Sequence, residues 1–440
     1  LFRSLWSTFV NLNQHIQSAI LSNLTEPSNR RIGVELECFF YDAECNRIPV
    51  NPTNQFSATD FLKEIQAQSK NENSQASYSL EPGGQLEWSS SPLTNLHDIH
   101  KEMEAHFSRA KDIVKNNNLI HLDFALEPMY SPDDIDLIQE NKYHLMDKRF
   151  RKVGKLGPWM MRNTTSIQVN LDIATKAEAE QMAWLADVLE PFCALLFANS
   201  PFMNGKPTGP KNMRYDIWDD TDSVRCGNLL DHGIFSSNGL LEKFANHVLK
   251  TPAIFVYGDQ GLAEEFSGTL GSYLEKMSQK DELKNEHIMS ALHQIFTHAR
   301  FKNVLEVRGA DRPPRGFEMA PIAFWLGLLS EKVTQDELTK LFDPLGIDDR
   351  KLFNKNARTL DLNQEAPKNQ LMGEWLKKIC NIALKGLDER SKNLNIENER
   401  KYLEPYLKIF FNYGFISLHR QKIFLQSGLD LKTFLFKQND

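Results

Sequence analysis

The sequence predicts an α+β fold, in which a largely antiparallel, curved sheet with one polar face is flanked by helices and followed by a helical C-terminal appendage. Four stretches alternate apolar and polar residues with the two-residue period of a strand. Other stretches, such as 95–118 and 177–200, carry apolar residues at helical spacing. Beyond residue 330 the chain becomes richer in Lys, Asn and Leu. We therefore predict a sheet-and-helix domain over 1–330 and a helical region over 331–440.

Composition and cysteine usage narrow the class of protein. The 440 residues are 41% hydrophobic and 25% charged, with a net charge of −7 and no basic run, so we expect neither nucleic acid nor a membrane as partner. The five cysteines form no CxxC pair and no zinc spacing, which is typical of reduced thiols and predicts a cytoplasmic protein. They stand at positions 38, 45, 193, 226 and 380.

The first 24 residues carry apolar side chains at helical spacing, interrupted throughout by Ser, Asn, Gln and His. This pattern predicts an amphipathic helix lying on the body of the protein rather than a signal peptide. No stretch approaches the roughly 20 apolar residues that a membrane span needs. Further along the chain, a strand is predicted over 119–126 and a helix over 280–300.

The stretch 77–92, SYSLEPGGQLEWSSSP, predicts a β-hairpin with a Pro-Gly-Gly turn. With a three-residue loop, Glu81 lies opposite Gln85 and Ser79 lies opposite Glu87. One face is then apolar, and the other carries Ser, Glu, Gln and Glu. For this hairpin alone, a polar side that meets water is the favoured interpretation.

Three further strands, over 32–40, 166–173 and 303–308, repeat the pattern. Side chains two residues apart on a strand point the same way, so each strand separates packed aliphatic residues from polar ones. The polar side chains aligned in this way are Glu35, Glu37, Gln168, Asn170, Asp172, Glu306 and Arg308.

These polar faces are unlike solvated strand faces, which normally mix in Lys and Thr. Carboxylates gathered in a partly dry pocket are costly unless a cation lies among them. Oxygen ligands without His or Cys suit Mg²⁺ or Mn²⁺, and Mg²⁺ in such sites usually accompanies nucleotide phosphates. The predicted metal ligands are Glu35, Glu37, Glu81, Glu87 and Glu306.

Five motifs, in this order, resemble the plant-type glutamate–cysteine ligase family, which also has bacterial members. They are SLEPGGQLEWSSSPL, KVGKLGPWMMRNTTSIQVNLD, LLFANSPFMNGKPTG, MRYDIWDDTDSVRCG and VLEVRGADRPP. The resemblance runs from about Gly33 to Leu329. It implies a glutamine-synthetase-like fold for the sheet and a catalytic role for the region 1–330.

The resemblance also implies a reaction. L-Glutamate would be activated at its side-chain carboxyl group by ATP, and the resulting γ-glutamyl phosphate would be taken by the amine of L-cysteine. The product, γ-glutamylcysteine, is the first intermediate of glutathione biosynthesis. Such a ligase needs no Ser or His nucleophile, but it needs Mg²⁺ (or Mn²⁺), an arginine for the transferred phosphoryl group, and two substrate pockets.

We assign the remaining roles on this basis. Arg308 would contact the γ-phosphate next to Glu306, and Gln168 and Asn170 would line the floor between nucleotide and amino acid. Arg214 lies in the segment that forms the amino-acid site in the resembled family, so it would hold a substrate carboxylate. An ion pair of Arg214 with Asp216 or Asp219 is the structural alternative.

The chain has neither the P-loop GxxxxGK[ST] nor the Rossmann GxGxxG motif, so phosphates would bind over the sheet. Lys152 and Lys155, beside the mobile-looking loop 154–157, are the predicted cofactor-binding lysines, with a solvated loop as the alternative. Two departures from the family pattern concern nucleotide or acceptor details. Cys38 stands where many members carry a basic residue, and Arg162 stands one position before the family's arginine.

Two alternatives to this function remain open. One is a related carboxylate–amine ligase with another acceptor amine. The other is a non-catalytic homologue that binds an amino acid or a nucleotide. Whether the chain is the glutamate–cysteine ligase or the related ligase, the sequence predicts a monomer or a homodimer acting on small molecules.

Overall fold

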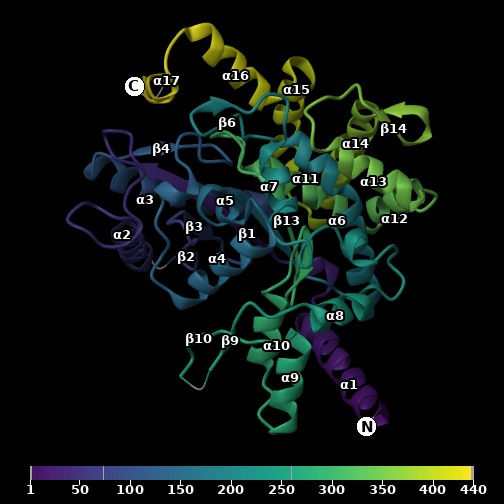
Figure 1. The fold of residues 1–440 in the computed structure, drawn as a ribbon. Helices are drawn as coiled ribbons and strands as arrows, with labels where there is room; N and C mark the ends of the chain where they lie inside the picture. Colours follow the sequence, from purple (N-terminus) through teal and green to yellow (C-terminus); the bar gives the residue numbers. More distant parts are fainter. Residues whose placement is uncertain (1, 73, 259, 438–440) are drawn as a thin grey trace.

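The computed structural model describes residues 2–72, 74–258 and 260–437, with side chains described from residue 11 to residue 436. Among these residues, seven antiparallel strands form the main sheet in the order β12-β13-β5-β1-β3-β2, with β4 also paired to β1 (Figure 1). The strands are β1 (Ile32–Tyr41), β2 (Ser77–Leu80), β3 (Leu86–Ser89), β4 (Ile120–Leu122), β5 (Ser166–Leu171), β12 (Ala299–Phe301) and β13 (Leu305–Asp311). The predicted fold class, helices around a largely antiparallel sheet, is confirmed.

The predicted hairpin forms with the expected register. Ser79 lies opposite Glu87, and the backbone N–H of Glu81 donates to the carbonyl oxygen of Gln85 across the turn (2.9 Å). On the other side of β3, Glu87 lies opposite Glu37 of β1. Because side chains alternate along each strand, this register puts the carboxylates of neighbouring strands on the same face.

Helices surround the sheet. They are α1 (Phe2–Ile20), α2 (Ala58–Asn71), α3 (Leu96–Asn116), α4 (Asn141–Val153), α5 (Gly157–Asn163), α6 (Lys176–Leu196), α7 (Met213–Asp219), α8 (Leu240–Lys250), α9 (Leu270–Gln279), α10 (Asn285–Leu292), α11 (Met319–Leu329), α12 (Lys332–Phe342), α13 (Ile347–Asn356), α14 (Met372–Leu394), α15 (Glu404–Tyr413), α16 (Ile416–Ser427) and α17 (Leu431–Lys437). None of the helices described is long and apolar enough to cross a membrane.

The apolar face of the sheet packs on α6 and α11, which carry the centre of the hydrophobic core. Val34, Val169 and Val307 on this face are at most 1% exposed. All eleven residues of α11 are buried, which explains why this segment is apolar all round. The polar face is left to α4, α5 and α7. Residues of the C-terminal helices, such as Trp375 of α14, belong to the same core cluster as the sheet.

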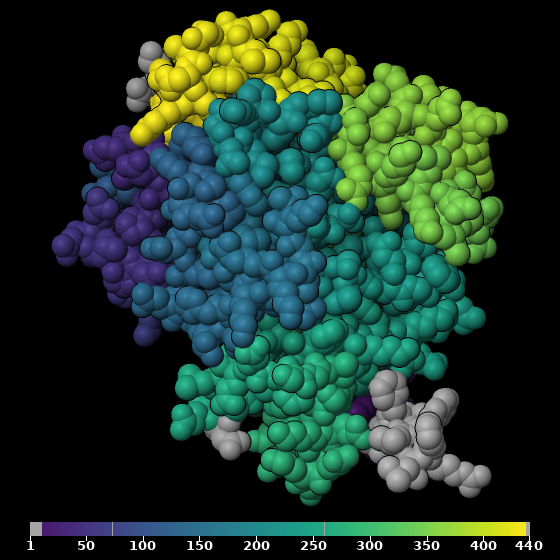
Figure 2. All heavy atoms as spheres, viewed as in Figure 1, coloured from purple at the N-terminus to yellow at the C-terminus, as the bar shows by residue number. Residues whose placement is uncertain are grey.

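The two ends of the molecule are built differently. At one end, α1 packs on α8, α9 and α10, and its predicted amphipathic character is seen in the buried Leu12, Ile16 and Ile20. At the other end, Phe434 of α17 joins Phe39 of β1 in a second apolar cluster. Figure 2 shows this last part of the chain, in yellow, lying against the rest of the surface.

Two-stranded sheets complete the fold. The pairs are β6 (Phe202–Met203) with β7 (Lys206–Pro207), β8 (Cys226–Gly227) with β11 (Phe296–Thr297), β9 (Val256–Tyr257) with β10 (Ala263–Glu264), and β14 (Glu365–Ala366) with β15 (Gln370–Leu371).

Some element boundaries differ from the prediction. The helix expected over 280–300 is wrong in its second half, because α10 ends at Leu292 and the chain then forms β11 and β12. Pairing of β12 with β13 overrides the weak helical pattern there, so Arg300 lies on a strand, opposite Glu306. The strand expected over 119–126 is reduced to the three residues of β4.

Gly83, in the turn of the hairpin, allows the turn to approach another segment closely. A Cβ added there would lie 2.5 Å from Cα and 2.6 Å from the carbonyl oxygen of Arg162, which are rigid backbone atoms. We therefore expect Gly83→Ala to lower the free energy of unfolding by about 1–3 kcal/mol, because the backbone must shift. Chemical denaturation measures the loss. The control is Gly346→Ala, whose methyl group would meet nothing closer than 3.8 Å, and an equal loss in both variants would contradict this account.

Candidate active site

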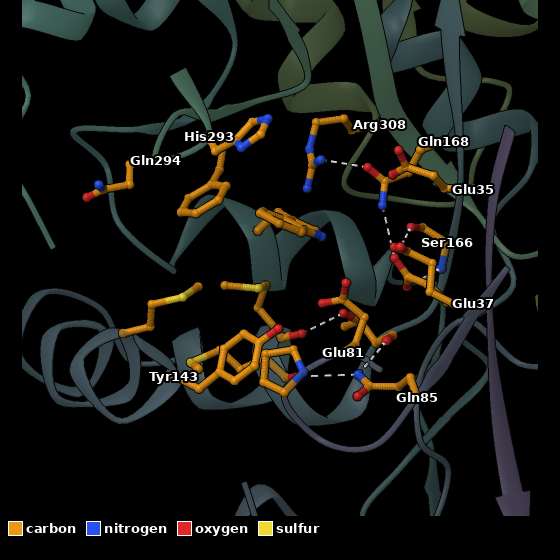
Figure 3. Close-up of a pocket in the computed structure, with 18 of the residues that line it drawn as sticks. Glu35, Glu37, Glu81, Gln85, Tyr143, Ser166, Gln168, His293, Gln294 and Arg308 are labelled. Atoms are coloured by element: carbon orange, nitrogen blue, oxygen red, sulfur yellow. Dashed lines mark hydrogen bonds between the residues drawn. The ribbon is translucent and has the colours of Figure 1, made fainter. Parts of the chain in front are cut away.

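A pocket of about 360 Å³ lies over the polar face of the main sheet (Figure 3). Residues of β1, β3, β5, β12 and β13 line one side of it, and residues of α4, α5 and α7 line the other. Met146, Met160 and Phe255 give this second side an apolar character. The polar faces that the sequence shows on separate strands thus come together at one cavity.

Three carboxylates form an acidic cluster at one end of the pocket. Glu37, Glu81 and Glu87 each offer an oxygen atom, and these three atoms lie within 4.8 Å of one another. Burial and the charge of Glu81 raise the pKa of Glu37 to about 7. Burial also raises the pKa of Glu81, and it raises that of Glu87 well above its usual range, with the neighbouring carboxylates as further causes. The cluster is thus destabilised by its own charge, which a divalent cation would relieve.

Hydrogen bonds fix the orientation of Glu37. Its carboxylate accepts from the backbone N–H of Ser166 (2.8 Å), from the Ser166 hydroxyl group (3.0 Å) and from Nε2 of Gln168 (3.0 Å). Oε1 of Gln168 in turn accepts from Nη1 of Arg308 (2.6 Å). Figure 3 shows this chain of contacts from Arg308 through Gln168 to Glu37. Because the amide nitrogen of Gln168 donates to Glu37 and its amide oxygen accepts from Arg308, only one orientation of the amide satisfies both partners.

The opposite end of the pocket is cationic. Glu306 is 0% exposed and lies beneath Arg300, Lys302 and Arg308, which line the pocket. It pairs with Arg300, with Nζ of Lys302 (2.7 Å) and with Nη1 of Arg308 (2.9 Å). Burial alone would raise the pKa of Glu306, but these three cations hold it well below the usual range. One buried anion among three cations leaves an excess of positive charge at the pocket surface.

The five carboxylates predicted as metal ligands are therefore not gathered in one group. Glu37, Glu81 and Glu87 are close together. Glu35 lies between the two ends and accepts from Nδ2 of Asn170 (3.1 Å) and from Nζ of Lys302 (3.4 Å). Asn170 and Glu306 lie behind the residues that line the pocket.

Arg214, on α7, is buried and lines the pocket. Its guanidinium group donates to the carbonyl oxygens of Gly309 (3.2 Å) and Arg308 (3.4 Å) and lies 3.5 Å from a carboxylate oxygen of Asp311. The alternative partners, Asp216 and Asp219, pair with Arg358 instead. The Trp218 ring lies near both site arginines, with its centroid 5.9 Å from the Arg214 guanidinium carbon and 5.5 Å from that of Arg308.

Lys152 and Lys155 are exposed at the end of α4 and in the loop that follows, and the structure places both outside the lining of the pocket. The cations that line it are Lys142, Arg214, Arg300, Lys302 and Arg308. Of the two departures from the family pattern, Cys38 faces the apolar core, where burial raises the pKa of its thiol. Arg162 pairs with Asp147 (2.7 Å).

Several lining residues were missed by the sequence analysis. Arg300 and Lys302 alternate in the stretch HARFKN, a strand signal that was hidden because a helix was extended through it. Lys142 and Tyr143 lie on α4, whose pocket-facing side carries no motif, whereas Trp218 lies in the motif MRYDIWDDTDSVRCG but has no role assigned from the sequence. Ser166, at the start of β5, could not be predicted as a site residue, because a lone serine gives no signal of its own.

Comparison with known proteins adds independent information. The family model "Glutamate-cysteine ligase family 2" matches residues 31–414. A chloroplastic glutamate–cysteine ligase of Medicago truncatula is 30% identical over 322 residues, which is 71% of this chain and 62% of that protein. A rice chloroplastic enzyme, glutamate–cysteine ligase B, is 27% identical over 394 residues, which is 86% of this chain and 78% of that protein. This chain thus spans less than two thirds of the Medicago relative.

Among solved structures, a glutamate–cysteine ligase of Francisella tularensis in complex with AMP superposes with a TM-score of 0.54. The alignment covers 94% of this chain and 88% of that one, at 12% sequence identity. At this identity the similarity concerns the fold alone.

The comparisons contradict the predicted cytoplasmic location, because the plant relatives are named as chloroplastic enzymes. The cysteines are free, and four of the five are buried. Free thiols indicate a reducing environment, but they do not identify the compartment.

The family match extends over most of the chain and includes every strand of the main sheet, from β1 to β13. The resemblance read from the sequence motifs is therefore confirmed. This chain belongs to glutamate-cysteine ligase family 2.

Proposed function

We propose that this chain is an ATP-dependent glutamate–cysteine ligase, which forms γ-glutamylcysteine through a γ-glutamyl phosphate. The observation that carries the proposal is the separation of charge in the pocket. An acidic cluster of Glu37, Glu81 and Glu87 lies at one end, and cations grouped over Glu306 lie at the other. A nucleotide with its metal ion carries both kinds of complementary charge.

The residues of the acidic cluster fit a divalent cation. The donor atoms are all carboxylate oxygens, which suit Mg²⁺ or Mn²⁺ rather than Zn²⁺. Burial, with repulsion between the carboxylates as a further cause, raises their pKa values. When bound, such an ion neutralises phosphate charge and positions phosphate oxygens. We propose Glu37, Glu81 and Glu87 as its ligands. Glu35 lies nearby, where it accepts hydrogen bonds from Asn170 and Lys302.

The cationic end suits the transferred phosphoryl group. Arg308 presents a planar fork of donors next to Arg300 and Lys302, and such donors stabilise the charge that develops during phosphoryl transfer. In this proposal Glu306 positions the three cations from below, because it lies behind the pocket lining and its charge is already balanced. This role differs from the metal-ligand role predicted from the sequence.

Arg214 is proposed to hold the α-carboxylate of glutamate. Its guanidinium group is fixed by backbone carbonyl oxygens, and Arg214 lines the pocket together with Trp218. Gln168, between the two charged ends, would keep the side-chain carboxylate of glutamate in line with the phosphate.

The proposed reaction then has two steps. A side-chain carboxylate oxygen of glutamate attacks the γ-phosphorus, the bond to the β-phosphate oxygen breaks, and ADP leaves. The amine of cysteine attacks the carbonyl carbon of the acyl phosphate, and inorganic phosphate and a proton are released. The protein supplies alignment and charge in a pocket with an apolar side that limits access of water.

Two further predictions from the sequence stay proposals. The region 1–330 would carry the whole site, because every lining residue of the pocket falls within it. The enzyme would act as a monomer or a homodimer on small molecules.

ADP formation tests the proposed function directly. We expect ADP release that needs glutamate, ATP and Mg²⁺, and that increases several-fold when cysteine is added, since the second step frees the site. A coupled assay measures it, with other amines in place of cysteine as the control. A higher rate with another amine would favour a related ligase, and binding of ATP without any ADP release would favour a non-catalytic homologue.

Mn²⁺ binding tests the acidic cluster. Glu87→Gln should weaken Mn²⁺ binding by about tenfold or more, because a ligand is lost. In the wild type, binding should tighten as the pH rises through 7 and should release protons, since the raised pKa of Glu37 means that a proton must leave first. Titration calorimetry in two buffers measures both effects.

The matched control is Glu306→Gln. It should keep the Mn²⁺ affinity but should lower the free energy of unfolding by roughly 3–5 kcal/mol, because three cations lose their buried partner. Loss of Mn²⁺ binding in this variant, with Glu87→Gln unaffected, would reverse the two assignments.

Arg308→Lys tests the arginine at the cationic end. Lysine keeps the charge but cannot contact Gln168, Glu306 and a phosphate oxygen with one planar group. We expect kcat to fall by on the order of 10²-fold while the KM for glutamate changes little. A nearly normal kcat would show that Arg308 serves only to pair with Glu306.

A further inference from the structure

Glu190, on α6, is a buried carboxyl group that the proposed reaction does not use. It is 1% exposed and lies beneath the main sheet, on the side opposite the pocket. Its Oε1 atom has no hydrogen-bond partner among the described residues. A polar group in this position is costly, so its presence calls for a physical reason.

The carboxyl group of Glu190 fills the space left by the missing side chain of Gly309. A Cβ atom added to Gly309 would overlap Oε1, Cδ and Oε2 of Glu190. Gly309 lies in β13 where the pairing with β5 changes register, between Val307 and Ala310. This irregularity is a β-bulge, a feature that redirects side chains next to functional sites. Glu190 therefore supports the bulge from below.

The bulge holds both arginines of the proposed site. Arg308 belongs to it and points into the pocket, and the carbonyl oxygens of Arg308 and Gly309 accept hydrogen bonds from Arg214. On its other edge, the backbone N–H of Arg308 donates to the carbonyl oxygen of His298 (3.0 Å). The ring of His298 lies against Glu190, with Nδ1 3.6 Å from Oε1.

His298, which contacts Glu190, is itself packed against an aromatic ring. Tyr215 stacks on the His298 ring, with an interplanar angle of 7°. Burial raises the pKa of Glu190 well above its usual range, with Asp187 and Asp311 adding to the shift and Arg214 opposing it. Burial lowers the pKa of His298 to about 3. Burial thus favours the uncharged forms of both Glu190 and His298.

We propose that Glu190 is a positioning residue, which keeps the β13 bulge in the shape that aligns Arg214 with Arg308. The inference rests on the proposed function, in which one arginine holds glutamate and the other holds the phosphoryl group. A shared support for both would fix the distance between the two reacting groups, and displacements of about 1 Å in such arrangements can cost on the order of 10²-fold in rate.

The test compares three variants of α6. Glu190→Gln keeps the shape and the uncharged state, Glu190→Ala empties the space under Gly309, and Val188→Ala removes buried volume from the same helix (3% exposed) without facing Gly309. Hydrogen exchange of the amides of 307–311 reports on the bulge without any turnover. Steady-state kinetics report on the KM for glutamate and on kcat.

For Glu190→Ala we expect faster exchange at 307–311, a KM for glutamate raised about tenfold and a kcat lowered about tenfold or more. Glu190→Gln should stay within about threefold of the wild type, and Val188→Ala should keep wild-type kinetics even where it lowers stability. Unchanged exchange and kinetics in Glu190→Ala would overturn the proposal, as would equal kinetic losses in Val188→Ala.

A second pair of variants keeps the test decisive if Glu190→Ala does not fold. Gly309→Ala should show the same losses, and Gly309→Ala with Glu190→Ser should recover part of them, because the overlap is removed. A fully active Gly309→Ala variant would overturn the proposal. If the wild type forms no ADP from glutamate and ATP, the proposed function fails, and the exchange measurements alone still decide whether Glu190 supports the bulge.

Discussion

Glu306 lies buried beneath Arg300, Lys302 and Arg308, and the organisation of the pocket depends on this one anion. Without it, three cations on two adjacent strands and the turn that joins them would repel one another in a partly dry environment. With it, their side chains are held at the surface of the pocket and keep an excess of positive charge there. The antiparallel pairing of β12 with β13 makes the arrangement possible, because Arg300 lies directly opposite Glu306.

The register of the sheet then sets the distance between the cationic and acidic ends. Glu87 lies opposite Glu37, and Glu35 lies opposite Gln168, so the acidic residues lie on β3 and β1, while Arg308 lies on β13, on the far side of β5. A slip of one residue between two strands would turn one set of these side chains into the apolar core. Burial of Val34, Val169 and Val307 on the other face therefore holds the site in register.

Much of this could be predicted from the sequence, because strand alternation is a local signal. The hairpin turn, the polar faces of four strands and the helices α3 and α6 all followed from the pattern of residues. Two things could not be predicted. The grouping of the five carboxylates depends on which strands are neighbours, which is not a local property. The pocket wall formed by Lys142, Tyr143 and Trp218 depends on how α4 and α7 pack, which no local pattern of residues determines.

Gln168 links the two ends of the pocket in a way that has a thermodynamic consequence. Its amide nitrogen is occupied by Glu37 and its amide oxygen by Arg308. A cation that binds the Glu37 carboxylate competes with the Gln168 side chain. An anion that binds the Arg308 guanidinium group competes with the same side chain. The first ligand to bind displaces Gln168, so the second ligand binds without this cost in free energy. By linkage, each ligand increases the affinity for the other by the same factor. The Gln168 amide thus favours simultaneous binding of a cation and an anion at the two ends of the pocket over binding at one end alone.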